Sequence, residues 1–205
     1  MGRLVSTLLL ARHGETIWHA ENRYAGSSDV GLTERGVAQA AALGRWAGSQ
    51  TIEAVYSSDL SRAVITATPA ATQLGLPLRI DPRLREVDFG QGEGMTSSEM
   101  RLVFPSELNE FHRSPGHSPL PGGEPGIAAL ERAWTALEEI AAVHSSAPVL
   151  VVMHSTLIRL VLCRALDMPI DRYRTAFPSV INAAITTITI GSGPPALHGY
   201  NVPTD

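Results

Sequence analysis

Two short apolar segments constrain the fold of this chain most, because each ends where residues able to do chemistry begin. Residues 8–11 lead directly into Arg12 and His13, and residues 149–153 lead directly into His154. A continuous apolar run of this length, bounded by polar groups, is typical of a strand buried within a parallel sheet. Open α/β sheets bind their ligands at the carboxyl ends of such strands. The two segments therefore predict a binding edge that carries one arginine and two histidines.

The rest of the chain alternates between extended and helical patterns. Strands are expected at residues 4–11, 52–56, 78–80, 149–153 and 182–190, and helices at 33–48, 60–74, 126–144 and 156–166. Thr33 is a candidate N-cap for the first helix, and Pro69 is expected to kink the second. Strands that alternate with helices indicate an α/β fold with three α/β/α layers around a mainly parallel sheet. Without a linker or an internal repeat, residues 1–205 are expected to form a single domain.

Composition and charge limit the classes of partner. The chain has a net charge of -4 and no basic block, which argues against nucleic acid and anionic membranes as partners. No apolar run approaches the roughly 20 residues of a membrane span, and residues 1–7 lead into the first strand without a signal peptide. The single Cys163 has no partner for an internal disulfide. A cytoplasmic protein is therefore expected, and its oligomeric state stays open, with a homodimer as one option.

Two further polar segments carry candidates for the same site. Arg62 lies just after the strand expected at 52–56, and Glu86 lies in the long connection that follows residue 80. With Arg12, His13 and His154 they supply the groups that phosphoryl transfer through a phosphohistidine requires. A guanidinium fork pairs with two phosphoryl oxygens, a neutral imidazole can attack as a nucleophile, and a positioned carboxyl group can donate a proton.

These segments, in this order, resemble the histidine phosphatase superfamily, which is also called the phosphoglycerate mutase-like family. The resemblance rests on Arg-His-Gly-Glu-Thr at 12–16, Ser-Asp-Leu-Ser-Arg-Ala at 58–63, Leu-Arg-Glu-Val-Asp-Phe-Gly at 84–90 and the late strand that ends at His154. It extends from residue 8 to about residue 190 and includes Leu-Thr-Glu-Arg-Gly at 32–36 and Pro-Gly-Gly-Glu at 121–124.

The resemblance implies a role for each candidate. His13 would be the phosphorylated nucleophile, with its ring oriented by a backbone carbonyl. Arg12, Arg62 and His154 would hold the phosphoryl group, and Glu86 would act as general acid and base. His154 also precedes a helix, whose free N–H groups could bind an anion. No cofactor and no metal are implied, and the chain lacks a metal-ligand spacing such as His-Glu-x-x-His.

Two positions of the expected phosphate site depart from the family pattern. His19 stands where the family commonly has the Asn that reaches the phosphate, and Ser155 stands where it has Gly. Both are expected to bind phosphate, and Thr16 is a further candidate. Thr16 and Ser57 equally fit turn or capping positions.

Other polar residues near these motifs are expected to be structural or exposed. Glu15 and Asp88 are expected to hold the arginines and the loops in place. The remaining histidines are expected at the surface; these are His112, His117, His144 and His198.

Three functions remain open at this point. The first is a phosphomonoesterase acting on a small phosphorylated metabolite, the second a cofactor-dependent phosphoglycerate mutase, and the third a phosphoanion-binding scaffold with little turnover. Mutases of the family carry a longer basic insert, whereas residues 92–121 contain only two arginines, Arg101 and Arg113. The phosphatase is therefore favoured. Residues 92–121 are expected to be a small lid insert. Most of its apolar residues are expected to form a packing face, and some are expected to face the substrate.

Overall fold

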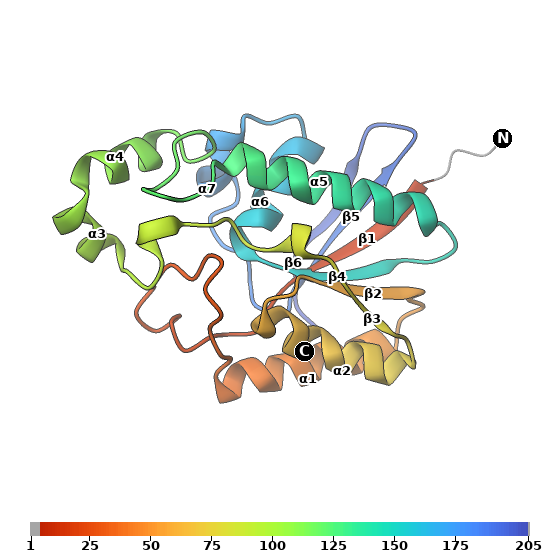
Figure 1. The fold of residues 1–205 in the computed structure, drawn as a ribbon. Coiled ribbons are helices and arrows are strands. Elements are labelled where there is room, and N and C mark those ends of the chain that lie inside the picture. Colours follow the sequence, from red (N-terminus) through yellow and green to blue (C-terminus); the bar gives the residue numbers. More distant parts are fainter. Residues whose placement is uncertain (1–4, 205) are drawn as a thin grey trace.

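The computed structural model describes residues 5–204, and its centre is a six-stranded sheet in the order β3-β2-β4-β1-β5-β6 (Figure 1). The strands are β1 (Val5–Arg12), β2 (Ala54–Ser57), β3 (Leu78–Ile80), β4 (Val149–Met153), β5 (Ile185–Gly191) and β6 (Ala196–Val202). β1 to β4 pair in parallel, and β5 and β6 add an antiparallel edge next to β1. The mainly parallel α/β fold expected from the sequence is confirmed. Residue 4, expected to begin the first strand, lies outside the described residues.

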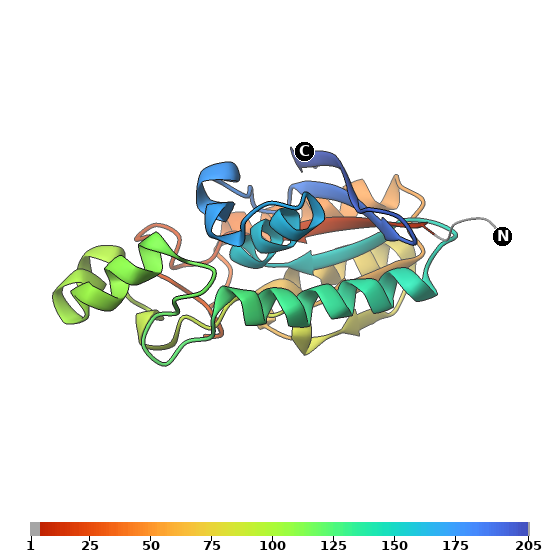
Figure 2. The same cartoon turned by 90° about the horizontal axis from the view of Figure 1, so that it is seen from above.

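Helices cover both faces of the sheet (Figures 1 and 2). The long ones are α1 (Glu34–Gly48), α2 (Ser61–Leu74), α5 (Gly126–Val143) and α6 (Ser155–Ala165). Leu8 and Leu10 of β1 belong to the core cluster that includes α5 and α6, whereas Leu9 and Ala11 belong to the cluster that includes α1 and α2. Successive residues of a strand point to opposite faces, so an apolar run is buried on both sides. This burial produces the three layers.

The helix boundaries follow local signals in the sequence. Thr33 caps α1, because its side chain accepts a hydrogen bond from the backbone N–H of Gly36. Helix α2 continues through Pro69 without interruption. Helix α5 ends one residue earlier than expected, at Val143. Within residues 5–204, no helix is both long enough and apolar enough to cross a bilayer.

The segment at 92–121 contains two helices that lie at one end of the molecule, beyond the sheet (Figure 1). They are α3 (Ser97–Val103) and α4 (Pro105–Arg113). Their buried residues Met100, Leu108 and Phe111 join the core cluster that includes α5. Asp171 fixes the far end of the segment, because it accepts hydrogen bonds from the backbone of Gly116 and the hydroxyl of Ser114.

The remaining short elements complete the connections. They are the helix α7 (Tyr173–Ala176) and the single 3-10 turns η1 (Pro82–Leu84), η2 (Gly90–Gly92) and η3 (Ile170–Arg172).

One histidine expected at the surface is buried. His144 follows the last turn of α5, and its Nε2 lies 3.0 Å from the hydroxyl of Tyr56 on β2. The C-terminal end of α5 therefore packs on the sheet instead of ending in solvent. The other three, His112, His117 and His198, are exposed as expected.

Candidate active site

A pocket of about 290 Å³ opens at the carboxyl ends of the parallel strands, which is the edge predicted from the sequence. Seven of the eight predicted site residues line it, namely Arg12, His13, Thr16, His19, Arg62, Glu86 and Ser155. The eighth, His154, is fully buried beside His13, with the two ring centroids 5.1 Å apart. No residue of 92–121 lines this pocket, so the lid role of that segment stays a prediction.

His13 is held as a neutral imidazole with one nitrogen free. Its Nδ1 lies 2.7 Å from the carbonyl oxygen of Gly14. A carbonyl oxygen can only accept, so Nδ1 carries the hydrogen and Nε2 keeps a lone pair. Burial lowers the pKa of His13 well below its usual value, and the charges of Arg12 and Arg62 lower it further. His13 is therefore uncharged near neutral pH and carries a nucleophilic nitrogen.

His154 directly follows β4 and is the N-cap residue of α6, and one of its ring nitrogens has no hydrogen-bond partner in the described chain. Its Nε2 lies 2.7 Å from the hydroxyl of Ser58. Its buried Nδ1 has no hydrogen-bond partner among residues 5–204. Burial, followed by the charge of Arg62, lowers the pKa of His154 well below its usual value. If the Ser58 hydroxyl donates to Nε2, then Nδ1 carries a hydrogen that an anion can accept.

Backbone carbonyl oxygens anchor the two predicted phosphate-binding arginines. Arg12 donates to the carbonyl of Val180, and Arg62 donates to the carbonyls of Ser28 and Gly26. The buried Nε of each guanidinium has no hydrogen-bond partner among residues 5–204. Burial lowers the pKa of Arg12 to about 10, so this group still carries its charge near neutral pH. Carbonyl anchors position the forks without neutralising them.

Glu86 lies in the connection between η1 and η2, and its carboxylate binds the backbone amides of the first turn of α6. Its Oε2 accepts a hydrogen bond from the N–H of Thr156, and its Oε1 accepts from the N–H groups of Leu157 and Val87. Two helix-start amides that could have bound a phosphate therefore bind this carboxylate instead. Oε1 accepts two bonds and Oε2 accepts one, so Oε2 keeps an unused lone pair.

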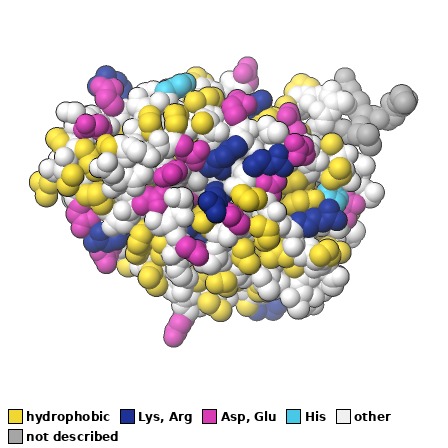
Figure 3. All heavy atoms as spheres, in the orientation of Figure 1, with side chains coloured by type: hydrophobic (Ala, Val, Ile, Leu, Met, Phe, Trp, Pro, Cys, Tyr) yellow, Lys and Arg dark blue, Asp and Glu magenta, His cyan; other side chains and the backbone are white. Residues whose placement is uncertain are grey.

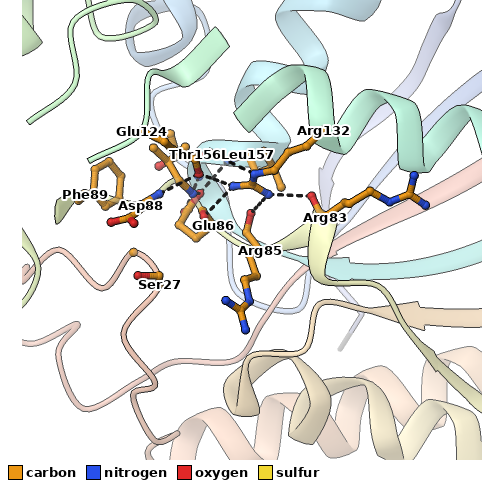
Figure 4. A network of polar contacts seen from close by, with 12 residues as sticks. Ser27, Arg83, Arg85, Glu86, Asp88, Phe89, Glu124, Arg132, Thr156 and Leu157 are labelled. Atoms are coloured by element: carbon orange, nitrogen blue, oxygen red, sulfur yellow. Dashed lines mark hydrogen bonds and ion pairs between the residues drawn. The ribbon is translucent and has the colours of Figure 1, made fainter. Parts of the chain in front are cut away.

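An arginine that the sequence did not single out fixes the loop that carries Glu86 (Figure 4). Arg132 reaches from α5 and donates to the carbonyls of Arg83, Arg85 and Glu86. It also pairs with Glu124 at 2.5 Å, and Glu124 accepts from the N–H of Asp88. The Gly-Gly-Glu segment at 122–124 and α5 thus clamp the loop on both sides of Glu86.

His19 has a different set of neighbours from a phosphate-binding amide. Its Nδ1 accepts from the N–H of Thr16, and its Nε2 lies 2.5 Å from Nη2 of Arg12. Burial and the charge of Arg12 lower the pKa of His19 to about 4. His19 is therefore a neutral group that contacts Arg12 within the pocket.

The motif glycines Gly14 and Gly36 meet backbone to backbone. A Cβ at Gly14 would lie 2.5 Å from the carbonyl oxygen of Gly36, and a Cβ at Gly36 would lie 2.1 Å from that of Glu15. The first turn of α1 therefore packs directly against the chain that follows His13. Close packing accounts for both glycines.

The supporting residues differ in part from the sequence expectation. Glu15 accepts from the hydroxyl of Thr33 and pairs with Arg35, and Asp88 accepts from the N–H of Gly90. Both fix loops, but neither pairs with Arg12 or Arg62. The hydroxyl of Ser57 donates to the carbonyl of Ser58 and Ser57 does not line the pocket.

Sequence reasoning missed residues that line the pocket and residues that contact its histidines. Asn182 donates from Nδ2 to the carbonyl of His13 at 2.7 Å. The hydroxyl of Ser58 contacts His154. The only signal for this residue in the sequence is its position in the motif at 58–63. The pocket is also lined by Tyr24, Arg159 and Arg174, whose positions depend on contacts between distant segments.

Charge is concentrated in the pocket and mixed outside it. On the face seen in Figure 3, acidic and basic side chains are interspersed over the described chain. No group of three or more His, Cys, Asp or Glu side chains in the described part of the chain is arranged to hold a metal ion. The cationic groups of the site are guanidinium groups.

Comparisons with known proteins agree on one family. The sequence profile of the histidine phosphatase superfamily (branch 1) matches residues 8–203. Phosphoserine phosphatase 1 of Hydrogenobacter thermophilus is 30% identical over 166 residues, which are 81% of this chain and 79% of that protein. A bifunctional protein of Mycobacterium tuberculosis is 40% identical over 161 residues, and this chain spans only 44% of its length. The structure of a mycobacterial glucosyl-3-phosphoglycerate phosphatase matches with a TM-score of 0.86 at 27% identity, covering 97% of this chain and 99% of that one.

Proposed function

The chain belongs to the histidine phosphatase superfamily, and we propose that it is a metal-independent phosphomonoesterase acting on a small phosphorylated metabolite through a phosphohistidine on His13. The observation that carries the proposal is a set of three buried nitrogens around one pocket. Arg12 Nε, Arg62 Nε and His154 Nδ1 lack partners among residues 5–204. A buried donor without a partner is costly, and the oxygens of a phosphoryl group would satisfy all three.

The first step is transfer of the phosphoryl group to the enzyme. Nε2 of His13 attacks phosphorus and the bond from phosphorus to the ester oxygen breaks. Charge on the equatorial oxygens is offset by Arg12, Arg62 and His154, which are already in place before the reaction. Glu86 gives its proton to the departing oxygen, and Oε2 is the atom assigned to carry it because it has the free lone pair.

The second step returns the enzyme to its starting state. Water attacks phosphorus on the opposite side from His13, and its proton goes to Glu86. The bond between phosphorus and Nε2 breaks and inorganic phosphate leaves. Positioned acid–base catalysis of this kind typically contributes about 10² to 10⁴ in rate. Ser155, Thr16 and His19 complete the phosphate site in this scheme.

The pocket supports a small substrate. Its volume of about 290 Å³ lies at the lower end of the roughly 300–1,000 Å³ typical of ligand sites. The names of the compared relatives, a phosphoserine phosphatase and a glucosyl-3-phosphoglycerate phosphatase, support a phosphate ester as the substrate class. We place the reaction in the cytoplasm, as expected from the sequence.

Phosphate release from a panel of small esters tests the proposal. The purified protein should release inorganic phosphate at the same rate with and without excess EDTA, because arginines supply the positive charge. Restoration of a chelated enzyme by Mg²⁺ or Zn²⁺ would contradict metal independence. Isotope exchange between phosphoglycerates without net phosphate release would identify a mutase, and binding of esters without turnover would identify a scaffold.

A further inference from the structure

Ser58 carries a buried hydroxyl that the proposed chemistry does not use. The residue directly follows β2, is fully buried, and donates its N–H to the carbonyl of Val152 on β4. This bond holds Ser58 beside the end of β4, where its hydroxyl lies 2.7 Å from Nε2 of His154. Ser58 does not line the pocket. It can therefore act on a substrate only through His154.

The ring of His154 has one hydrogen to place. Burial keeps this imidazole neutral, because it lowers the pKa well below the usual value, and a neutral imidazole carries its hydrogen on either Nδ1 or Nε2. Nδ1 has no partner among residues 5–204, so a hydrogen there can be donated to a phosphoryl oxygen. A hydrogen on Nε2 leaves Nδ1 with a bare lone pair, which repels that oxygen. The position of one hydrogen therefore decides whether His154 binds phosphate.

The hydroxyl of Ser58 selects between the two positions. A hydroxyl can donate or accept, and within residues 5–204 this one forms no hydrogen bond other than that with His154. If it accepted from Nε2, its own hydrogen would be buried without an acceptor, and Nδ1 would present a lone pair to the anion. If it donates to Nε2, its hydrogen is used and the ring hydrogen on Nδ1 is free for the phosphoryl oxygen. A buried donor without a partner is costly, so donation by Ser58 is favoured when an anion is bound.

We propose that Ser58 is a positioning residue, which donates its hydrogen to Nε2 of His154 and thereby keeps the ring hydrogen on Nδ1 for a phosphoryl oxygen. The two histidines are then fixed in complementary ways. The carbonyl of Gly14 accepts from Nδ1 of His13 and leaves Nε2 free to attack, whereas the hydroxyl of Ser58 leaves His154 a donor. This inference rests on the proposed phosphatase activity.

The position of the hydrogen can be read by NMR without turnover. Protein labelled with ¹⁵N in its histidines is saturated with inorganic phosphate, and His154 is assigned through the signals that His154→Gln lacks. A ring nitrogen that carries hydrogen resonates far upfield of a bare one. In the unaltered protein, Nδ1 of His154 should carry the hydrogen and Nε2 should be bare. Hydrogen on Nε2 in the phosphate-bound protein would overturn the proposal.

The matched variants are Ser58→Ala and Ser57→Ala. Ser57 is equally buried, and its hydroxyl donates to the carbonyl of Ser58 instead of contacting His154. Loss of the hydrogen bond to Nε2 should move the Nε2 signal of His154 further downfield in Ser58→Ala and leave it in place in Ser57→Ala. An unchanged Nε2 signal in Ser58→Ala would contradict donation by Ser58.

Kinetics give a second reading. In Ser58→Ala, kcat/KM should fall about tenfold on an alkyl phosphate and on p-nitrophenyl phosphate alike, because all esters share the phosphoryl group. Ser58→Thr keeps the hydroxyl and should recover most of this loss, and Ser57→Ala should keep most of its activity. Equal losses in the two Ala variants would reduce Ser58 to a structural residue.

Failure of this inference is separable from failure of the phosphatase proposal. If the protein turns over no ester, the phosphatase proposal fails on its own, and the spectrum with inorganic phosphate still decides the role of Ser58. Circular dichroism checks that each variant is folded. If Ser58→Ala does not fold, the spectrum of the unaltered protein decides.

Discussion

Glu86 and the arginines of the pocket are held in different ways, and this difference separates their roles. Arg12 and Arg62 are anchored by neutral carbonyl oxygens, and the Nε of each has no hydrogen-bond partner among residues 5–204. Glu86 is anchored by backbone amides and keeps a free acceptor lone pair on Oε2. In the proposed mechanism the free donors bind phosphoryl oxygens, whereas the free lone pair holds a proton for the leaving group. The two kinds of residue should therefore respond differently to the chemistry of the ester.

Replacement of Glu86 by Gln should matter most when the leaving oxygen is a poor leaving group. Glu86→Gln removes the acid, so phosphoenzyme formation should slow by about 10² to 10⁴ on an alkyl phosphate and far less on p-nitrophenyl phosphate. Rapid-quench bursts measure this step separately from the later attack of water. In Arg62→Gln, whose lost charge serves any ester, both substrates should suffer alike. Equal losses in Glu86→Gln would remove Glu86 from the acid role.

At the scale of elements, the site depends on α1 packing against the chain after His13. A Cβ at Gly36 would lie 2.1 Å from the carbonyl oxygen of Glu15, and neither backbone can yield without moving its element. Gly36→Ala should lower the free energy of unfolding by about 1–3 kcal/mol, and turnover should fall because the chain beside His13 shifts. The control is Gly31→Ala, where a Cβ meets nothing within 4 Å. Urea denaturation measures both, and equal stability of the two variants would refute the packing argument.

The elements that the sequence predicted are those with a strong local pattern. The buried strands β1, β2 and β4 and the amphipathic helices α1, α2, α5 and α6 appear within one or two residues of their expected bounds. Strand β6 was missed because it lies at an edge, is partly exposed, and has Asn201 in a left-handed conformation near a register shift, which breaks the alternation. Helices α3 and α4 are short, yet α3 begins with a capping box formed by Thr96 and Glu99, a signal that could have been read.

At the scale of the whole molecule, the three histidines of the site couple stability to pH. Burial lowers the pKa of His13 and His154 well below 6.5 and that of His19 to about 4. Below pH 6.5 the unfolded chain takes up protons that the folded chain does not. The free energy of unfolding should therefore fall as the pH drops from 6.5 toward 4, by up to about 1.4 kcal/mol per pH unit for each histidine. Above pH 6.5 these groups contribute no slope.

Urea denaturation between pH 4.5 and 8, in buffer without phosphate, checks this coupling. His19→Asn should make the slope below pH 6.5 shallower by up to one proton. The control, His198→Asn, changes an exposed histidine on β6 and should leave the slope as it is. Stability that is flat between pH 5 and 6.5 would contradict the neutral histidines described here.

What the sequence could not predict are contacts between distant segments. It placed His13, Glu86 and both arginines at one site through their motifs, and seven of the eight candidates line one pocket. It could not show that the amides of α6 would bind Glu86, or that Arg132 would clamp the loop that carries it, because those partners lie 46 to 71 residues apart in the chain. Arg159 and Arg174 likewise reach the pocket only through the packing of α6 and α7.

Trapping the phosphoenzyme tests the central claim most directly. The unaltered protein, mixed with an ester carrying labelled phosphate and quenched within milliseconds, should yield a phosphoprotein that is labile in acid and stable in base. Peptide mapping should place the label on His13, and His13→Ala should show neither label nor turnover. A label on any other residue, or phosphate release by His13→Ala at the rate of the unaltered protein, would contradict the account.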